Sequence, residues 1–113
     1  MIENYSFGQL TINGEKYNKD VKICANEIVH PWWRKEGHIV EKEDIKDILQ
    51  VNPEILVLGK GNPGMMKASK DLKEFLQNKG ILLLEEPSAQ AVDSFNQYLE
   101  QGKKVCAGFH LTC

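Results

Sequence analysis

The chain has 113 residues, of which 42% are hydrophobic and 27% are charged, and its formal net charge is -2 at pH 7. This length and composition predict a single globular domain, residues 1–113, large enough to bury a core without cross-links. Because 16 acidic residues outnumber 14 basic ones, the chain has no general attraction for nucleic acid or for a membrane surface, and we expect neither as a partner.

The apolar runs and the cysteines both bear on the compartment of the protein. The longest apolar runs, at 55–58 and 81–84, are four residues, far below the ~20 that a membrane helix needs, and Met1 leads into no signal segment. The cysteines, Cys24, Cys106 and Cys113, are odd in number and form no C-x-x-C pair, which predicts reduced thiols rather than a disulfide framework. We therefore expect a cytoplasmic protein.

The first third of the chain carries the signals of antiparallel hairpins. Apolar residues between Tyr5 and Ile12 lead into Asn13-Gly14, the dipeptide that best tolerates the positive φ angles of a type I′ turn. A second alternating run, 21–24, is followed after the polar break Ala25-Asn26-Glu27 by a short apolar run at 28–30. The sequence therefore predicts two hairpins.

Two tryptophans followed by an arginine form the most unusual composition in the chain. The indoles of Trp32 and Trp33 beside the guanidinium of Arg34 can form a stacking or cation–π surface, although a tryptophan is also a common core residue. Because adjacent residues of an extended chain point to opposite sides, we expect one indole in the core and Trp33 with Arg34 at the surface. His30 and His38 lack metal-ligand spacing, and we include His38 in the candidate interaction surface.

Periodic apolar residues predict three helices in the rest of the chain. They lie near residues 43–50, 70–78 and 89–101, because apolar side chains recur there at spacings of three and four. Ser69 and Ser88 stand at the N-cap positions of the second and third helix, where a hydroxyl can accept a backbone N–H.

Three strands are predicted between and after these helices. The apolar runs 55–58 and 81–84 read as buried strands, and 105–111 as the last strand. Strands that alternate with helices indicate parallel pairing. We therefore predict an α/β fold: a compact three-layer domain whose mixed sheet has antiparallel N-terminal hairpins and a C-terminal β-α-β-α-β part.

The strand at 55–58 leads into a glycine loop that matches the dinucleotide fingerprint G-x-G-x-x-G, and Glu85 has the spacing of the ribose-binding acid. However, the next helix is capped only at Ser69, and too few strands follow for a second nucleotide-binding half. We therefore expect no NAD and no other cofactor. Two interpretations stay open, a tight turn or a small anion held by loop N–H groups. The candidate ligand-binding residues are Gly59, Lys60, Gly61 and Asn62.

The C-terminal residues Cys106, His110 and Cys113 are of types that bind metals or act as nucleophiles. In a strand, Cys106 and His110 share a face but lie ~13 Å apart, and Cys113 points to the opposite face. One ion cannot bind all three, so we expect no metal site, and we name no catalytic residue. An activated Cys113 would need a neighbouring base.

A set of residues spread over nearly the whole chain carries a family resemblance. These residues are Gly8, Asp20, Trp33-Arg34, Gly37-His38, Gly59-Lys60-Gly61, Lys79-Gly80-Ile81, Ala91, Phe95-Asn96, Gly102-Lys103 and Phe109-His110-Leu111-Thr112-Cys113. In order and spacing the set resembles the small domain shared by the mitochondrial respiratory complex I assembly factor subunit three and the adipogenesis-associated domain proteins, with archaeal and bacterial relatives.

This resemblance implies a compact three-layer α/β domain without an established catalytic activity, whose eukaryotic members serve as assembly or regulatory partners. It matches Gly59, Lys60 and Gly61 to the family's glycine loop and residues 110–113 to its terminal motif. Because the chain lacks a mitochondrial-type leader, a role in complex I assembly is not implied, and we expect a prokaryotic, cytoplasmic version.

The sequence thus predicts a non-catalytic interaction or assembly-factor-like module with a protein partner, and with a small-anion or ligand pocket at the glycine loop. The loops at the carboxyl ends of parallel strands are where open α/β sheets bind ligands, and the glycine loop follows one such strand. The candidate interaction surface is Trp33, Arg34, His38, His110 and Cys113. The alternative is a small-molecule or nucleotide-binding enzyme that uses Cys113 and His110.

Overall fold

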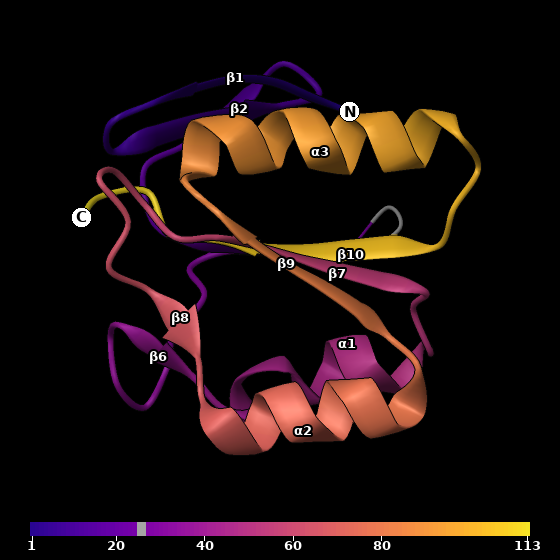
Figure 1. Ribbon diagram of the computed structural model, residues 1–113. Helices are drawn as coiled ribbons and strands as arrows, with labels where there is room; N and C mark the ends of the chain where they lie inside the picture. The colour runs from indigo at the N-terminus through magenta and orange to yellow at the C-terminus, as the bar shows by residue number, and fades with distance from the viewer. Residues whose placement is uncertain (25–26) are drawn as a thin grey trace.

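Figure 1 shows the computed structural model of the chain, which describes residues 1–24 and 27–113. In chain order its elements are β1 (Ile2–Ser6), β2 (Gln9–Ile12), β3 (Glu15–Tyr17), β4 (Val21–Cys24), β5 (Glu27–Val29), β6 (Ile39–Val40), the 3-10 helix η1 (Lys42–Ile45), α1 (Lys46–Gln50), β7 (Ile55–Gly59), β8 (Lys67–Ala68), α2 (Lys70–Lys79), β9 (Leu82–Glu86), α3 (Ser88–Glu100) and β10 (Val105–Phe109). The predicted α/β class is confirmed.

A five-stranded mixed sheet forms the middle layer, with the strand order β5-β4-β10-β7-β9. The central strand β10 pairs in parallel with β7 and antiparallel with β4, and β7 pairs in parallel with β9. The three strands predicted to be parallel are therefore parallel, and the second predicted hairpin, β4 with β5, forms the other side of the sheet. The turn of that hairpin, at Ala25-Asn26, lies outside the described residues.

Two layers cover the sheet, one on each face (Figure 1). One face carries α3 and the small sheet β1-β2-β3, and the other carries η1, α1, α2 and the short pair β6 and β8. Alternation along β7 divides its side chains between two cores: Ile55 and Val57 join the core under α3, whereas Leu56 and Leu58 join the core over α2. The predicted three-layer arrangement follows from strands that are apolar on both faces.

The small sheet contains one predicted turn and one that the sequence analysis did not predict. Asn13 and Gly14 have φ angles of 49° and 83°, and they join β2 to β3 as the turn signal indicated. A further turn at Phe7 and Gly8, where Gly8 has a φ of 80°, splits the first predicted strand into β1 and β2. The apolar alternation changes phase at this turn, between Phe7 and Leu10.

The strand β9 lies at an edge of the sheet, so the prediction that residues 81–84 form a buried strand is wrong in its burial. Leu82 is 49% exposed, and Leu83 and Leu84 are half-buried. The physical reason is the path of the chain after β9. It crosses β7 through α3, and the next strand, β10, pairs with the inner side of β7, so β9 stays at the edge. An apolar run indicates a strand but does not show whether a neighbour covers both of its edges.

The helices follow the predicted ranges, with corrections at the ends. Ser69 caps α2 by accepting the Leu72 N–H at 3.1 Å, whereas the predicted cap of α3 is wrong: Pro87 is the N-cap, and Ser88 is a buried residue of the first turn. The Ser88 hydroxyl instead donates to the His110 carbonyl at 2.5 Å. The region predicted as 43–50 begins with the 3-10 turn η1, and β10 ends at Phe109, two residues earlier than predicted.

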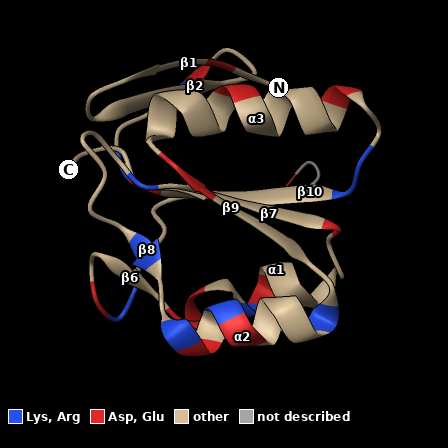
Figure 2. Ribbon diagram, in the orientation of Figure 1, with Lys and Arg blue, Asp and Glu red and all other residues tan. Residues whose placement is uncertain are grey.

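Charge is distributed unevenly over the two helices that cover the sheet (Figure 2). Basic and acidic residues intersperse along α2, whose apolar residues Leu72 and Leu76 are buried, while the charged residues of α3 are Asp93 and Glu100. Along the described parts of the chain, each helix is too short or too polar to cross a membrane.

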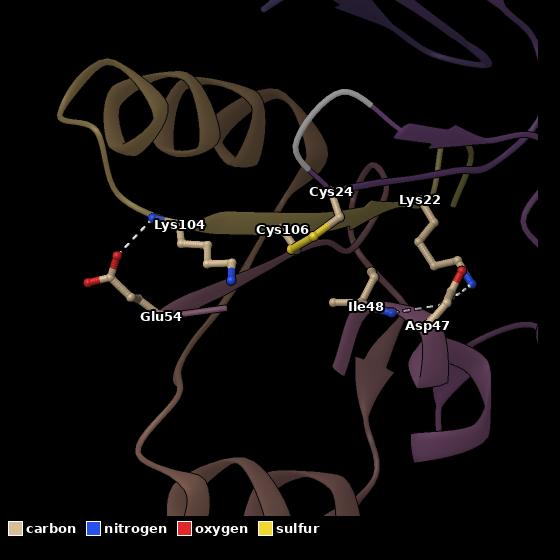
Figure 3. The surroundings of a disulfide bond; sticks show 7 residues. All are labelled: Lys22, Cys24, Asp47, Ile48, Glu54, Lys104 and Cys106. Carbon is tan, nitrogen blue, oxygen red and sulfur yellow. Dashed lines mark hydrogen bonds and ion pairs between the residues drawn. A yellow bond between two sulfur atoms is a disulfide. The ribbon is translucent and has the colours of Figure 1, made fainter. Parts of the chain in front are cut away.

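Two of the cysteines are joined, so the prediction of reduced thiols is wrong for this pair. Cys24 on β4 and Cys106 on β10 are direct cross-strand partners with Cα atoms 4.3 Å apart, and their sulfur atoms form a disulfide (Figure 3). Cys113 is the free cysteine. Cysteine count alone could not reveal the pairing, because it depends on the register between strands 82 residues apart. The cysteines therefore no longer favour a cytoplasmic location.

Candidate functional site

Asp20 is the centre of a polar cluster that joins three distant segments of the chain. Its Oδ2 atom accepts hydrogen bonds from Arg34 Nη2 at 2.7 Å and from His110 Nδ1 at 2.8 Å. Its Oδ1 atom accepts the backbone N–H of Leu111 at 2.9 Å. Asp20 lies just before β4, Arg34 lies between β5 and β6, and His110 follows β10. We call Asp20, Arg34 and His110 the Asp20 cluster.

Arg34 is held by three kinds of contact. Besides the bond to Asp20, its Nε atom donates to the Gly37 carbonyl at 2.9 Å, and its Cζ atom lies 4.5 Å from the centre of a Trp32 ring. The Arg34 side chain is only 4% exposed, so its predicted place at the exposed surface is wrong. The two tryptophans do point to opposite sides, as predicted: Trp32 is 3% exposed and Trp33 is 78% exposed.

The ring of His110 is oriented by the same carboxylate. Because a carboxylate can only accept, the Nδ1 atom of His110 carries the proton of this hydrogen bond. Arg34 Nη2, 3.4 Å from this nitrogen, is a second donor to the same oxygen and not a partner of the ring. The ring of His38 packs edge-on against His110 with centres 5.3 Å apart.

Two nitrogens of the cluster are left over, and we call them the open nitrogens. Arg34 Nη1 and His110 Nε2 each expose less than 1 Å² and have no hydrogen-bond partner among residues 1–24 and 27–113. Buried polar groups in proteins are nearly always hydrogen-bonded. A polar ligand at the open nitrogens would therefore supply the hydrogen bonds that they lack in the described chain.

The charge of Asp20 is stabilised by its partners. Burial of the carboxyl group acts to raise its pKa, but the hydrogen bonds from His110, Arg34 and the Leu111 N–H outweigh burial. The pKa of Asp20 is therefore lowered from its ordinary value of 3.8, and the group is a carboxylate at neutral pH. The positive charge of Arg34 is thus balanced within the cluster.

A cavity of about 380 Å³ lies against this cluster, and we call it the Arg34–His110 cavity. Its wall contains the three cluster residues, both tryptophans, and residues that directly precede β4 or directly follow β10. The full lining is Asn18, Lys19, Asp20, Pro31, Trp32, Trp33, Arg34, Gly37, His110, Leu111 and Thr112. The volume is at the small end of the range for ligand pockets.

The structure brings together only part of the predicted interaction surface. Trp33, Arg34 and His110 line the cavity, and His38 contacts the His110 ring. Cys113 is exposed, and the lining of the cavity ends at the preceding residue, Thr112. The backbone carbonyl of Cys113 accepts the Met65 N–H at 3.1 Å.

The glycine loop binds residues of its own chain. The Lys60 N–H donates to the Glu86 carbonyl at 2.8 Å, the Gly61 N–H to the Ser88 hydroxyl at 2.9 Å, and the Asn62 N–H to the Thr112 carbonyl at 2.9 Å. These donors are therefore already used inside the protein. This geometry supports a loop that positions the C-terminal residues rather than one that presents a row of N–H groups to an anion.

Gly61 is the residue of this loop that most needs to be glycine. Its φ angle is +99°, and a Cβ atom here would overlap the Thr112 carbonyl oxygen and lie 2.8 Å from His110 Cδ2. Because Gly61 has no side chain, the backbone of the loop can lie directly against Thr112 and His110. The interpretation of the glycines as a tight turn agrees with this close approach.

Sequence reasoning did not identify Asp20 or Ser88 as site residues. Asp20 is a single acid in a loop, without a motif of its own, and its partners are 14 and 90 residues away. Its presence in the resemblance set was the one signal that could have singled it out. Ser88 was assigned to a helix cap because its position before the apolar stripe suits that role equally well.

The described residues also bear on metal binding and on catalysis. Across residues 1–24 and 27–113, no three His, Cys, Asp or Glu side chains gather as metal ligands would. The Asp20–His110 hydrogen bond does have the geometry in which a carboxylate orients an imidazole, leaving Nε2 for proton transfer. The cluster can therefore bind a polar group, and it has one element of a general base.

The sequence and fold have relatives among known proteins. A family described as a protein of unknown function (DUF498/DUF598) matches residues 2–110. Among solved structures, the conserved hypothetical protein PH1505 from Pyrococcus horikoshii OT3 is 23% identical with a TM-score of 0.83, over 100% of this chain and 99% of that chain.

Two further solved structures agree with this match. XCC1710 from Xanthomonas campestris is 17% identical with a TM-score of 0.84, over 98% of this chain and 83% of that chain. A protein named MT938 is 24% identical with a TM-score of 0.79, over 100% of this chain and 98% of that chain. At these identities the likeness to the solved structures shows a shared fold.

Proposed function

We propose that this chain, which belongs to the DUF498/DUF598 family of proteins of unknown function, is an interaction module whose working site is the Arg34–His110 cavity. The single observation that carries the proposal is the pair of open nitrogens on two buried side chains of the cavity wall. Elements that only stabilise a fold satisfy their polar groups internally, whereas a binding site keeps donors for its ligand. The exposed indole of Trp33 supplies an apolar contact beside them.

This proposal moves the working surface away from the glycine loop and onto the cavity. The loop keeps a supporting role, because its N–H groups hold Thr112 and Ser88. A protein partner is the kind of ligand that the resemblance to assembly-factor domains implies. The sequence implies no role in complex I assembly, and we propose none.

A co-purification comparison tests the interaction. The variants are Trp33→Ala, which removes the exposed indole at the cavity, and Leu82→Ala, which removes another exposed apolar side chain, from the edge strand β9. We expect Trp33→Ala to lose partners that Leu82→Ala keeps, with both variants folded by circular dichroism. A partner list that Trp33→Ala leaves unchanged would contradict the proposal.

A hydrolytic or group-transfer enzyme is the second candidate, and the Asp20–His110 hydrogen bond favours it. An enzyme that uses Cys113 needs His110 close enough to activate the thiol. The rate of Cys113 alkylation in wild type and in His110→Gln measures this directly. Under the interaction proposal, the two rates agree with each other and with that of a free model thiol. A fast rate that falls in His110→Gln would favour the enzyme.

A further inference from the structure

We propose that the Arg34–His110 cavity binds a carboxylate group, held between Arg34 Nη1 and His110 Nε2. The inference deepens the proposed function, because it names the chemical group by which the cavity recognises its ligand. It depends on the bonding of the two side chains, the charge of the wall and the size of the cavity.

Arg34 requires an acceptor as its remaining partner. A guanidinium has donors only, and here Nε donates to Gly37 and Nη2 to Asp20, which leaves Nη1. Carboxylates are the acceptors that match a guanidinium best, because charge-assisted N–H···O bonds are about twice as strong as neutral ones. The bond to Asp20 shows that this arginine already pairs with a carboxylate on its other side.

His110 can supply the second hydrogen bond. Its Nδ1–H is fixed on Asp20, so a ligand meets the ring at Nε2. A carboxyl group of a ligand meets this nitrogen through a single proton, which lies between Nε2 and a ligand oxygen. The charged or titratable groups that face the ring are Asp20, Arg34 and His38.

The charge of the wall favours a single negative charge on the ligand. The charged residues among the lining of the cavity are Lys19, Asp20 and Arg34, which sum to one positive charge with His110 neutral. A wall with a net positive charge attracts an anionic ligand and gives no such attraction to a neutral one. This attraction favours a carboxylate over an uncharged amide or alcohol of the same shape.

The size and surface of the cavity indicate what carries the carboxylate. A volume of about 380 Å³ accommodates a small organic acid or one residue of a peptide. Trp33, a residue that is 78% exposed, offers an aromatic side chain for the ligand's apolar part. The shared chemistry is therefore a carboxylate on a small apolar body.

Two isosteric probes test this chemistry on the full chain. Benzoate carries the carboxylate, and benzamide has the same shape without the charge. Titrations followed by two-dimensional NMR should give saturable shifts of the Trp33 indole N–H with benzoate, and an affinity for benzamide lower by about tenfold or more. Equal affinity for the two probes, or no saturable shift with benzoate, would overturn the proposal.

Three variants locate the benzoate site. We expect Arg34→Gln to lose benzoate binding, Lys19→Gln to weaken it by about threefold, and Lys79→Gln, at the far end of α2, to leave it unchanged. Because Arg34→Gln removes buried contacts and can fail to fold, Lys19→Gln against Lys79→Gln is the second comparison. Wild-type affinity in folded Arg34→Gln, or equal affinities in the two lysine variants, would place the carboxylate elsewhere.

A peptide pair distinguishes the source of the carboxylate and separates this proposal from the proposed function. A short peptide that ends in phenylalanine with a free carboxylate is compared with its C-terminal amide and with benzoate. Tighter binding of the free-acid peptide indicates a protein partner, and tighter binding of benzoate indicates a small acid. If Trp33→Ala loses a partner while neither acid binds, the proposed interaction is supported and the proposed carboxylate ligand is wrong.

Discussion

The carboxylate of Asp20 accepts three N–H donors, one from a guanidinium, one from an imidazole and one from the backbone. Its side chain is 18% exposed, so these bonds operate in a region where water competes weakly. Removing its charge leaves buried donors of Arg34 and His110 without their acceptor. The residue therefore combines a structural role with the orientation of both groups that carry the open nitrogens.

The substitution Asp20→Asn should lower the free energy of unfolding by about 2–4 kcal/mol at neutral pH, because a neutral amide replaces a charged acceptor of buried donors. Unfolding in urea measures this difference in free energy. The matched control is Asp47→Asn, which also removes a carboxylate paired with a cation, Lys22, but from a side chain that is 55% exposed. There solvent screens the pair, and we expect about 1 kcal/mol or less. Equal losses in the two variants would contradict a special role for Asp20.

The lowered pKa of Asp20 predicts a dependence of stability on pH. A carboxyl group whose pKa is lower in the folded state than its ordinary value of 3.8 stabilises the fold fully above that value, and this contribution is lost as the pH falls through the folded-state pKa. The difference in unfolding free energy between wild type and Asp20→Asn should therefore be constant above about pH 5 and shrink below about pH 4. The pKa of Asp47 is also lowered, but Asp47 is present in both proteins and cancels. A difference that does not change between neutral and acidic pH would contradict this assignment.

At this scale the sequence indicated the residue types of the site but not their bonding. The expectation that Trp32 and Trp33 point to opposite sides needed only the alternation of an extended chain, and it is confirmed. The burial of Arg34 depends on Asp20, which approaches it from another loop. The spacing of neighbouring residues in the sequence does not reveal a contact between two separate loops.

At the scale of elements, the pairing of β4 with β10 carries the disulfide. Cys24 and Cys106 are opposite each other on these strands, with Lys22 bound to Asp47 on one side and the Lys104 N–H bound to Glu54 on the other (Figure 3). The bond closes a loop of 82 residues. Cross-links over long loops stabilise mainly by restricting the unfolded chain.

Replacing the pair, as Cys24→Ala with Cys106→Ala, should lower the free energy of unfolding by roughly 2–4 kcal/mol. Cys113→Ala is the control and should leave it almost unchanged, because that side chain is exposed. Alkylation under denaturing conditions followed by mass spectrometry tests the bond itself. We expect one modified cysteine without reductant and three with it, and three without reductant would show that the bond is absent.

Helix positions and strand types could be predicted from periodicity, whereas neighbours across the sheet could not. The runs that became β7 and β9 look equally apolar, yet β7 is fully buried and β9 lies at the edge. Ser88 shows the same limit for a single residue, because its hydroxyl has two physically reasonable uses and the fold selects the His110 carbonyl. In each case, the burial of the strand or the partner of the hydroxyl depends on an element that is distant in sequence.

At the scale of the whole molecule, residues 110–113 are held by contacts from the small N-terminal sheet and from the glycine loop. The Leu111 carbonyl accepts the Gly8 N–H at 2.8 Å and the Tyr5 hydroxyl at 2.9 Å, and the Thr112 carbonyl accepts from the glycine loop. The small N-terminal sheet, the glycine loop and the cavity therefore share one segment. A change in the loop should reach the cavity through these residues.

Gly61→Ala tests this coupling. The new Cβ atom would overlap the Thr112 carbonyl oxygen and press on His110, at a φ of +99° that alanine adopts with strain. We expect a loss of about 3 kcal/mol or more in unfolding free energy, from overpacking added to backbone strain. The NMR signals of the Trp33 indole and of Leu111 should shift, because residues 110–113 must move. Gly80→Ala is the matched control: its φ is +74°, but no atom lies within 4 Å of the added Cβ among the described residues, so only the backbone cost of about 1 kcal/mol remains. If the two variants lose the same stability, or if the cavity signals stay in place in Gly61→Ala, the glycine loop does not position the site.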